Sequence, residues 1–329
     1  MNAKLVHLAG AVLSAATLLV AAPGAHAQPF PNKIVHLVVP FQAGTGSDVL
    51  ARLVTPRLSE LLGQNVIVEN RPGGGSGSIA FEALAKTPNP DGYTLLVGTN
   101  AQILIAQAIQ GNKLPYNTQT DFVALGAIAR TPMVLVVSAS DKAPKNIGEF
   151  ISSVKAGKSN FSSPALGGFG HLVAEVLMYQ LGAKATHIAY RGSAQSLTDV
   201  STGEILFATD SPAAALALIR GNRLRPIAMT GASRSAALPN VPTFEELGVK
   251  GMNIAAWFAV FGASKMPAEA ISRLRTEIAK LVREDEYRAK LAPMSLEPYV
   301  ATPETFERAV RDELPFWEKF VKDSGVKVD

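Results

Sequence analysis

The chain has 329 residues, no cysteine, and 31 basic against 27 acidic side chains, which gives a formal net charge of +4 at pH 7. The lack of cysteine excludes disulfide bridges, thiolate metal ligands and thiol nucleophiles. The basic residues are scattered among nearly as many acidic ones and do not alternate with aromatic residues, which argues against a nucleic-acid partner. A chain of this length is long enough for two domains of ordinary size.

The first 27 residues have the pattern of a secretory signal peptide. A short segment containing Lys4 precedes an apolar run at residues 8–22, and Ala25-His26-Ala27 places small residues at the two positions that a signal peptidase recognises. The alternative is a membrane anchor, but the apolar run is only about 15 residues long, whereas a helix needs about 20 to span a bilayer. We therefore expect residues 1–27 to be a signal peptide, cleaved after Ala27.

Short β-branched runs then alternate with helical stretches. A strand at residues 34–39 is followed by a helix at residues 47–62, whose leucines fall on one face and in which Pro56 predicts a kink or the start of a second helix. Further strands are predicted at residues 66–69, 93–98, 133–138, 186–190, 205–209, 224–229 and 256–261. This alternation predicts an α/β fold in which each sheet is mostly parallel and flanked by helices.

The helices of the second half have clearer boundaries. Ser211 is a good N-cap and Pro212 suits the first helical position that follows it. Two long helices are predicted near the C-terminus, at residues 267–284 and 303–324, and Pro315 is expected to kink the second of them. Because these helices need a sheet to cover, we expect them to return to the first part of the fold.

This organisation predicts two lobes joined by two chain crossings, near Arg130 and near Ala255. The first lobe would consist of residues 28–130 plus 255–329, and the second lobe of residues 131–254. Two crossings between α/β lobes form a hinge with a cleft beside it. We expect a ligand to bind in that cleft.

Three loops that follow predicted strands lead into helices, at residues 40–48, 162–171 and 209–212. Ligands of α/β sheets bind beyond the carboxyl ends of the strands, where these loops lie. In the first loop the glycines expose backbone N–H groups, and Thr45 and Ser47 add hydroxyl donors next to the positive end of a helix dipole. Such loops predict an anion site without arginine, although each of them is also compatible with an ordinary helix cap.

Two glycine-rich segments bear on nucleotide binding. Gly44 and Gly46 lack the third glycine of a dinucleotide fingerprint, and no GxxxxGK[ST] motif occurs in the chain. The segment at residues 71–78 is either a second anion-binding nest or a simple turn. We expect no cofactor.

A hydrolase is an alternative that the residues themselves raise. His171 together with Ser163 and Asp210 has the composition of a catalytic triad, but the chain has no GxSxG nucleophile elbow. The histidines also show no metal-ligand spacing such as HExxH. We therefore expect no catalytic residue and no metal site.

Short motifs along nearly the whole mature chain, in the same order and spacing, resemble the substrate-binding proteins of tripartite tricarboxylate transporters, often called Bug proteins. The matching motifs are Val39-Pro40-Phe41-x-Ala43-Gly44 with Ser47-Asp48, Val68-Glu69-Asn70-Arg71-Pro72-Gly73, Asp91-Gly92-Tyr93-Thr94-Leu95-Leu96, Leu114-Pro115-Tyr116, Asp121-Phe122, Gly170-His171-Leu172, Tyr190-x-Gly192, Leu197-Thr198-Asp199, Ile219-Arg220-Gly221, Ala237-Leu238-Pro239-Asn240-Val241-Pro242-Thr243 and Trp257-Phe258. Each motif alone is weak, but their order and spacing together are specific.

The resemblance implies a two-lobe periplasmic-binding-protein fold of type II-like architecture, hinge closure on a small organic carboxylate, and delivery to the permease subunits of a tripartite transporter. It also implies a periplasmic protein, which we expect to be a monomer. One ligand carboxylate would be held by the loop after the first strand and by the loop ahead of His171, partly through ordered waters. Carried onto this chain, the ligand-binding residues are Phe41, Ala43, Gly44, Thr45, Ser47, Asp48, Ser163, Gly168, His171 and Asp210.

Two departures from the family pattern lie in these loops, so the ligand cannot be copied from a relative. Gln42 stands where the family commonly has proline, and residues 166–169 replace a run that is usually richer in Asn, Ser and Thr. Asp210 is expected either to accept a hydrogen bond at the far end of the ligand or only to cap a helix. A receptor that presents its ligand to a membrane signalling partner remains an alternative to transport.

Overall fold

The structure is a computed structural model that describes residues 29–43, 45–73, 77–164, 166–190 and 192–326. The expected signal peptide and Gly44, one of the predicted ligand residues, lie outside these ranges. No helix in the described part of the chain is both long and apolar enough to cross a membrane.

The first lobe is built on a six-stranded sheet with the strand order β11-β4-β10-β3-β1-β2. Its strands are β1 (Val35–Val39), β2 (Val66–Asn70), β3 (Thr94–Thr99), β4 (Phe122–Thr131), β10 (Ala256–Ala263) and β11 (Glu297–Pro298). β1 pairs in parallel with β2 and β3, whereas β10 is antiparallel to both β3 and β4. The edge strand β11 is antiparallel to β4.

Helices cover both faces of this sheet, since β1 is apolar on both sides. Leu37 and Val39 belong to the cluster that includes Leu50 and Leu58 of one helix, whereas Val38 belongs to a second cluster on the opposite face. The helices of this lobe are α2 (Gly46–Leu62), α3 (Ser78–Ala85), α4 (Ala106–Gln110), α9 (Ala268–Leu281), α10 (Asp285–Leu291) and α11 (Pro303–Ser324). α2 continues through Pro56, so this proline does not start a second helix.

The second lobe is built on a five-stranded sheet with the order β7-β6-β8-β5-β9. Its strands are β5 (Val134–Ser138), β6 (Ser159–Ser163), β7 (Ala185–Ala189), β8 (Phe207–Asp210) and β9 (Leu224–Met229), and its helices are α5 (Ile147–Lys155), α6 (Phe169–Leu181), α7 (Ser193–Thr202) and α8 (Pro212–Arg220). β6 is parallel to β7 and β8, while β5 is antiparallel to β8 and β9.

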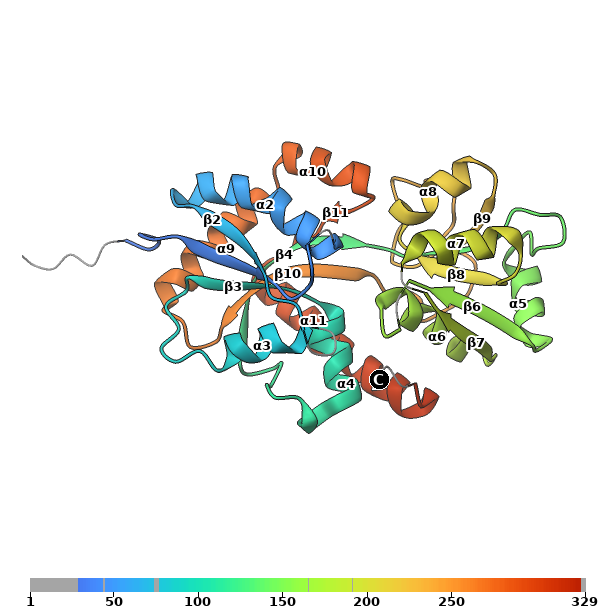
Figure 1. The fold of residues 1–329 in the computed structure, drawn as a ribbon, viewed down its shortest axis with the longest axis horizontal. Coiled ribbons are helices and arrows are strands. Elements are labelled where there is room, and N and C mark those ends of the chain that lie inside the picture. Colours follow the sequence, from blue (N-terminus) through green and yellow to red (C-terminus); the bar gives the residue numbers. More distant parts are fainter. Residues whose placement is uncertain (1–28, 44, 74–76, 165, 191, 327–329) are drawn as a thin grey trace, which may run out of the picture.

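The two lobes predicted from the sequence are confirmed, but both sheets are mixed rather than mostly parallel. The cause is the way in which the chain passes between them (Figure 1). β4 ends at Thr131 and β5 begins at Val134, so β5 starts at the lobe interface and runs away from it, opposite to β6 and β8. β10 likewise starts at the interface with Ala256 and runs against β3.

The C-terminal helix α11 reaches both lobes, whereas the sequence predicted only a return to the first (Figure 1). Beyond Pro315, which does not interrupt the helix, Trp317 packs 6.4 Å from Phe169 and Phe320 packs 5.8 Å from Tyr179, both distances measured between ring centroids. Phe169 and Tyr179 belong to α6 of the second lobe. α11 is therefore a further connection between the lobes, made by packing.

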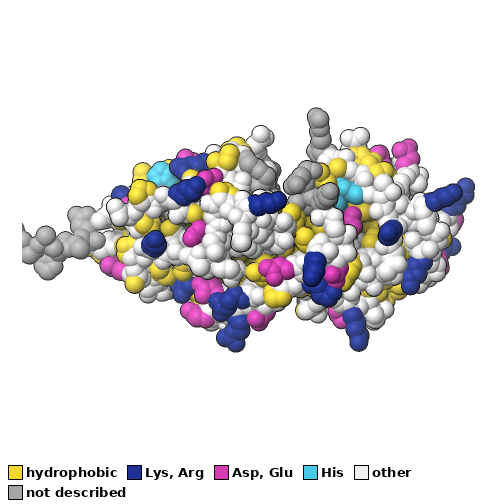
Figure 2. Space-filling model, turned by 90° about the horizontal axis from the view of Figure 1, so that it is seen from below, with side chains coloured by type: hydrophobic (Ala, Val, Ile, Leu, Met, Phe, Trp, Pro, Cys, Tyr) yellow, Lys and Arg dark blue, Asp and Glu magenta, His cyan; other side chains and the backbone are white. Residues whose placement is uncertain are grey.

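Basic and acidic side chains are interspersed over the face of the molecule shown in Figure 2, and its outline narrows between the two lobes. The part of this face that the structure describes carries no extended patch of a single sign.

Candidate functional site

A cavity of about 580 Å³ lies between the two lobes, at the carboxyl ends of β1, β3, β6 and β8 and at the starts of β5 and β10. Its size is in the range of small-molecule sites. The described residues that line it are Phe41, Thr45, Gly46, Ser47, Thr99, Asn100, Ala101, Gln102, Thr131, Met133, Gly168, Phe169, Ser211, Ala213, Ala256, Phe258, Met294 and Leu296. Both crossing segments and the first turns of three helices thus meet at one cavity.

In the first lobe, the N-terminus of α2 opens into this cavity. Thr45 is the N-cap in an extended conformation (φ −73°, ψ 160°), but its side chain does not cap the helix. Its hydroxyl instead donates to the Gln42 carbonyl at 3.0 Å. The first intrahelical bond comes only from Val49 N–H, so the N–H groups of Gly46 and Ser47 have no helical partner.

Asp48 holds the loop at residues 40–48 in place. Its carboxylate accepts hydrogen bonds from Arg52 at 3.1 Å and from the Asn70 amide at 2.9 Å, and it is 2% exposed. Asn70 also donates to the Phe41 carbonyl at 3.0 Å. Asp48 therefore fixes the loop to β2, and it is not among the described residues that line the cavity.

In the second lobe, the N-terminus of α6 opens into the same cavity. Gly168 is the N-cap (φ −68°, ψ 160°), and it has no side chain that could cap the helix. The helix start lies directly against β8, since a Cβ added to Gly170 would be 2.4 Å from the Thr209 carbonyl oxygen. The Thr209 hydroxyl also donates to the Gly170 carbonyl. These contacts fix the direction in which the N–H groups of Phe169 and Gly170 point.

A buried group of polar side chains lies beneath the start of α6. Ser163 bonds to His187 Nε2 at 2.8 Å, and the rings of His187 and His171 stack with centroids 3.9 Å apart. His171 Nδ1 in turn accepts a hydrogen bond from Gly167 N–H at 3.1 Å. Burial, followed by the charge of His171, lowers the pKa of His187 to about 4, against an opposing effect of Glu175.

Ser163 and His171 therefore form no catalytic triad with Asp210. The serine bonds to His187, a residue that the sequence analysis did not single out. Both Ser163 and His171 are buried below the loop, and neither is among the lining residues described above.

Asp210 ends β8 next to the cavity and is 5% exposed. Its Oδ1 accepts from Ser211 N–H at 2.7 Å, and its Oδ2 has no hydrogen-bond partner in the part of the chain that the structure describes. Burial raises the pKa of Asp210, against the opposing effect of the neighbouring residues Ser193 and Ser211. Asp210 does not itself cap α8, because Ser211 does so by accepting from Ala214 N–H at 3.3 Å.

The structure thus brings Phe41, Thr45, Ser47 and Gly168 to the cavity wall, while Ala43 is exposed outside the described lining. The end of β3, which supplies Thr99, was not among the loops predicted from the sequence. The rule that ligands bind beyond the carboxyl ends of strands could have found it. No local pattern marks Met294 or Leu296, which reach the cavity only through tertiary packing.

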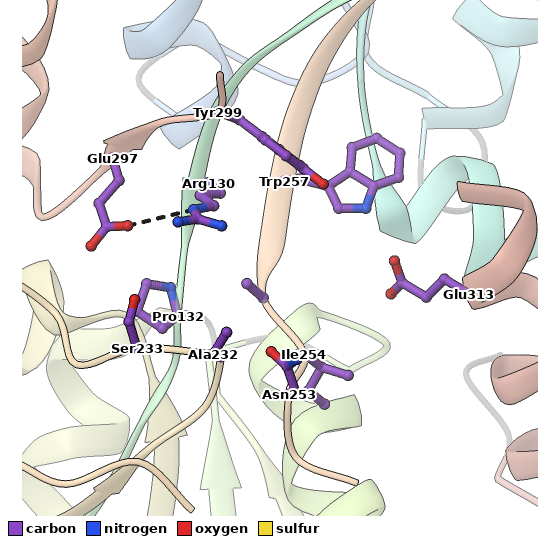
Figure 3. Close-up of a pocket in the computed structure, with 12 residues that line it drawn as sticks. Arg130, Pro132, Ala232, Ser233, Asn253, Ile254, Trp257, Glu297, Tyr299 and Glu313 are labelled. Carbon is purple, nitrogen blue, oxygen red and sulfur yellow. Dashed lines mark ion pairs between the residues drawn. The ribbon is translucent and has the colours of Figure 1, made fainter. Parts of the chain in front are cut away.

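A second, smaller cavity of about 150 Å³ lies beside the crossing strands (Figure 3). Unlike the described lining of the first cavity, its lining includes charged side chains. Arg130 there forms an ion pair with Glu297, with Nε and Oε2 3.5 Å apart, and Glu313 points in from α11. Burial raises the pKa of Glu313, against hydrogen bonds from Trp317 and Trp257. Its charged side chains are already paired or hydrogen-bonded within the protein, so this cavity is the weaker candidate for a ligand site.

The fold and the interlobe cavity define a two-lobe solute-binding protein. The chain belongs to the tripartite tricarboxylate transporter receptor family (TctC), whose family model matches residues 50–326. It is 31% identical to the protein BugT of Bordetella pertussis over 315 residues, which cover 95% of each chain. Members of this family bind solutes in the periplasm, and the chain is accordingly a binding protein rather than an enzyme.

Solved structures of relatives agree with this assignment. The Rhodopseudomonas palustris protein Rpa4515, solved with adipate, is 34% identical, with a TM-score of 0.76 and coverage of 90% of this chain and 98% of that one. The periplasmic binding protein BugD is 26% identical, with a TM-score of 0.74 and coverage of 91% and 99%.

Proposed function

We propose that this protein captures a small organic carboxylate in the interlobe cavity and delivers it to the membrane permease subunits of a tripartite transporter. The observation that carries the proposal is the pair of helix N-termini, α2 from one lobe and α6 from the other, that line one cavity without side-chain caps. The adipate bound to the relative Rpa4515 supports a carboxylate as the ligand class.

The chemistry of the two helix starts suits one carboxylate. Each N-terminus carries a partial positive charge and backbone N–H donors that lack an intrahelical partner. A carboxylate between them would accept hydrogen bonds from Gly46 and Ser47 on one side and from Phe169 and Gly170 on the other, directly or through water. Asp210, whose Oδ2 has no hydrogen-bond partner among the described residues, is our candidate for accepting a hydrogen bond from another part of the ligand.

Ligand binding would draw the lobes together, because its donors come from both of them. We propose that residues 28–130 plus 255–329 and residues 131–254 move relative to each other about the two crossings. Small-angle scattering should then show a smaller radius of gyration at saturating ligand. An unchanged profile, with binding measured independently, would count against closure.

The decisive test removes one backbone donor. Gly46 is exposed, a Cβ added to it would meet no atom within 4 Å, and the extended conformation of Thr45 is compatible with a following proline. Gly46→Pro therefore keeps the helix start, where proline is favoured, but removes the N–H group. A hydrogen bond to a charged group is worth about 1.5–3 kcal/mol, so affinity should fall about ten- to a hundredfold by calorimetry.

Gly46→Ala is the matched control, because it adds a Cβ and keeps the N–H group. It should bind like the wild type, and the methyl ester of the ligand should not bind. If Gly46→Ala and Gly46→Pro weakened ligand binding equally, crowding by the added side chain and not the loss of the N–H donor would be responsible. Tight binding of the ester would contradict carboxylate recognition altogether.

We also propose that the exported protein begins at Gln28, after cleavage at Ala27. Mass spectrometry of protein recovered from the periplasm should give the mass of residues 28–329. A mass that retains the first 27 residues would refute the cleavage site.

A further inference from the structure

The described lining of the interlobe cavity consists of apolar residues, glycines and uncharged polar residues. Half of the described lining residues are apolar and come from both lobes: Phe41, Ala101, Met133, Phe169, Ala213, Ala256, Phe258, Met294 and Leu296. None of the lining residues that the structure describes is Lys, Arg, His, Asp or Glu. The charged side chains near the crossings belong instead to the smaller cavity with Arg130 and Glu313.

Most polar side chains in the lining already have partners within the protein. The Asn100 amide donates to the Ala255 carbonyl at 3.0 Å, and the Thr131 hydroxyl lies 3.1 Å from the Pro132 carbonyl and 3.2 Å from the Ser295 carbonyl. The Thr99 hydroxyl donates to Gln102 Oε1 at 2.7 Å. Besides neutral groups such as the Gln102 amide, the donors in the described lining that suit an anion are therefore the N–H groups at the starts of α2 and α6.

The backbone donors of the two helix starts can serve one carboxylate together, and none of the described lining residues offers a cation to a second. A second carboxylate on the ligand would lose its hydration against apolar side chains, and burial of an unpaired charge is strongly unfavourable. An apolar ligand body would instead gain from contact with Phe41, Phe169 and Phe258.

We propose that the ligand is a monocarboxylate with an aromatic or extended hydrocarbon body, and that the site discriminates against dicarboxylates. This inference rests on the proposed function, since it assumes that the cavity binds a carboxylate. It distinguishes this chain from the relative Rpa4515, whose solved structure contains adipate.

Hexanoate and adipate are a matched pair of probes, because they share a six-carbon chain and differ only in the second carboxylate. We expect hexanoate to bind the mature protein at least about tenfold more tightly than adipate, measured by calorimetry at neutral pH. Phenylacetate and benzoate should also bind more tightly than adipate. Equal or tighter binding of adipate would overturn the inference and leave the proposed function standing, whereas failure of every carboxylate to bind would overturn both.

A gain-of-function variant tests the physical cause. Met294 lines the cavity, is partly exposed, and belongs to none of the buried clusters, so it can be replaced without opening the core. Met294→Lys adds a cation to a wall whose described residues carry none, and it should raise the affinity for adipate relative to hexanoate at least about tenfold. Met294→Gln, which is polar but uncharged, should leave the ratio near that of the wild type. The inference fails if Met294→Lys folds, as judged by circular dichroism, and the ratio does not move.

Discussion

Two helices of the second lobe begin at the same cavity, and they begin differently. α8 starts with Ser211, whose hydroxyl accepts from Ala214 N–H, and with Pro212, which has no N–H group to satisfy. α6 starts with Gly168 and has no side-chain cap. The same backbone groups thus stabilise one helix locally and remain available to a ligand at the other. We infer that the start of α8 serves stability, whereas the uncapped start of α6 serves ligand binding.

The largest effect should come from crowding the start of α6. Gly170→Ala would place a Cβ 2.4 Å from the Thr209 carbonyl oxygen, a backbone atom that cannot rotate away. Such overpacking typically costs about 1–3 kcal/mol, and the tight approach here favours the upper end of that range. Urea denaturation should show it as a lower midpoint.

Gly46→Ala serves as the control for this measurement, because its Cβ would meet open space at the start of α2. It should be as stable as the wild type. If Gly170→Ala were as stable as the wild type, α6 and β8 would be able to move apart. The inference that their contact fixes the direction of the α6 N-terminus would then be wrong.

A smaller effect should appear with pH, because the titratable side chain of His187 lies beneath the start of α6. The pKa of His187 is lowered to about 4 from 6.5, so the unfolded chain takes up a proton at a higher pH than the folded chain does. The stability that neutral His187 contributes is complete above pH 6.5 and is lost as the pH falls towards 4. His187→Gln should therefore lose less stability than the wild type between pH 7 and pH 4.5.

The measurement is the midpoint of denaturation across that pH window. Gly46→Ala, which lies in the other lobe and whose Cβ would meet open space, removes no titratable group and should keep the slope of the wild type. Identical slopes for His187→Gln and the wild type would mean that His187 does not titrate differently on folding.

The smallest effect should come from removing the cap of α8. Ser211→Ala loses the hydrogen bond to Ala214 N–H, and loss of an N-cap costs about 1 kcal/mol. Thermal denaturation should show a small drop in melting temperature, which Ser211→Thr should restore because threonine also caps. If Ser211→Ala weakened carboxylate binding as strongly as Gly46→Pro, the division between the two helix starts would be wrong.

Local sequence signals predicted the parts of the fold that depend on neighbouring residues. Ser211 and Pro212 fixed the start of α8, and the alternation of strands and helices predicted two α/β lobes. The direction of β5 was not predictable in this way, because it depends on the chain entering the second lobe at the interface. A pairing such as that of Ser163 with His187, which are 24 residues apart, depends on the register of neighbouring strands.

The residues of the candidate site also fall into two groups, those marked by local sequence and those placed by tertiary packing. Loops that follow strands could be recognised, and four of the ligand residues predicted in them, including Thr45 and Gly168, lie on the cavity wall. The apolar members Met294 and Leu296 could not be found from local pattern, because they come from a turn after α10 that packs across the first lobe. The sequence therefore indicated the loops at the helix starts better than the apolar part of the cavity wall.

The contacts of α11 with both lobes also determine how the protein unfolds. Trp317 and Phe320 share one buried cluster with Phe81 of the first lobe and with Phe161 and Phe207 of the second. Two sheets that share a continuous core lose that core together, so heating should melt the protein in a single cooperative transition. The second lobe expressed alone would leave the α11-facing side of α6 uncovered, and the two halves are in this sense one unit of folding.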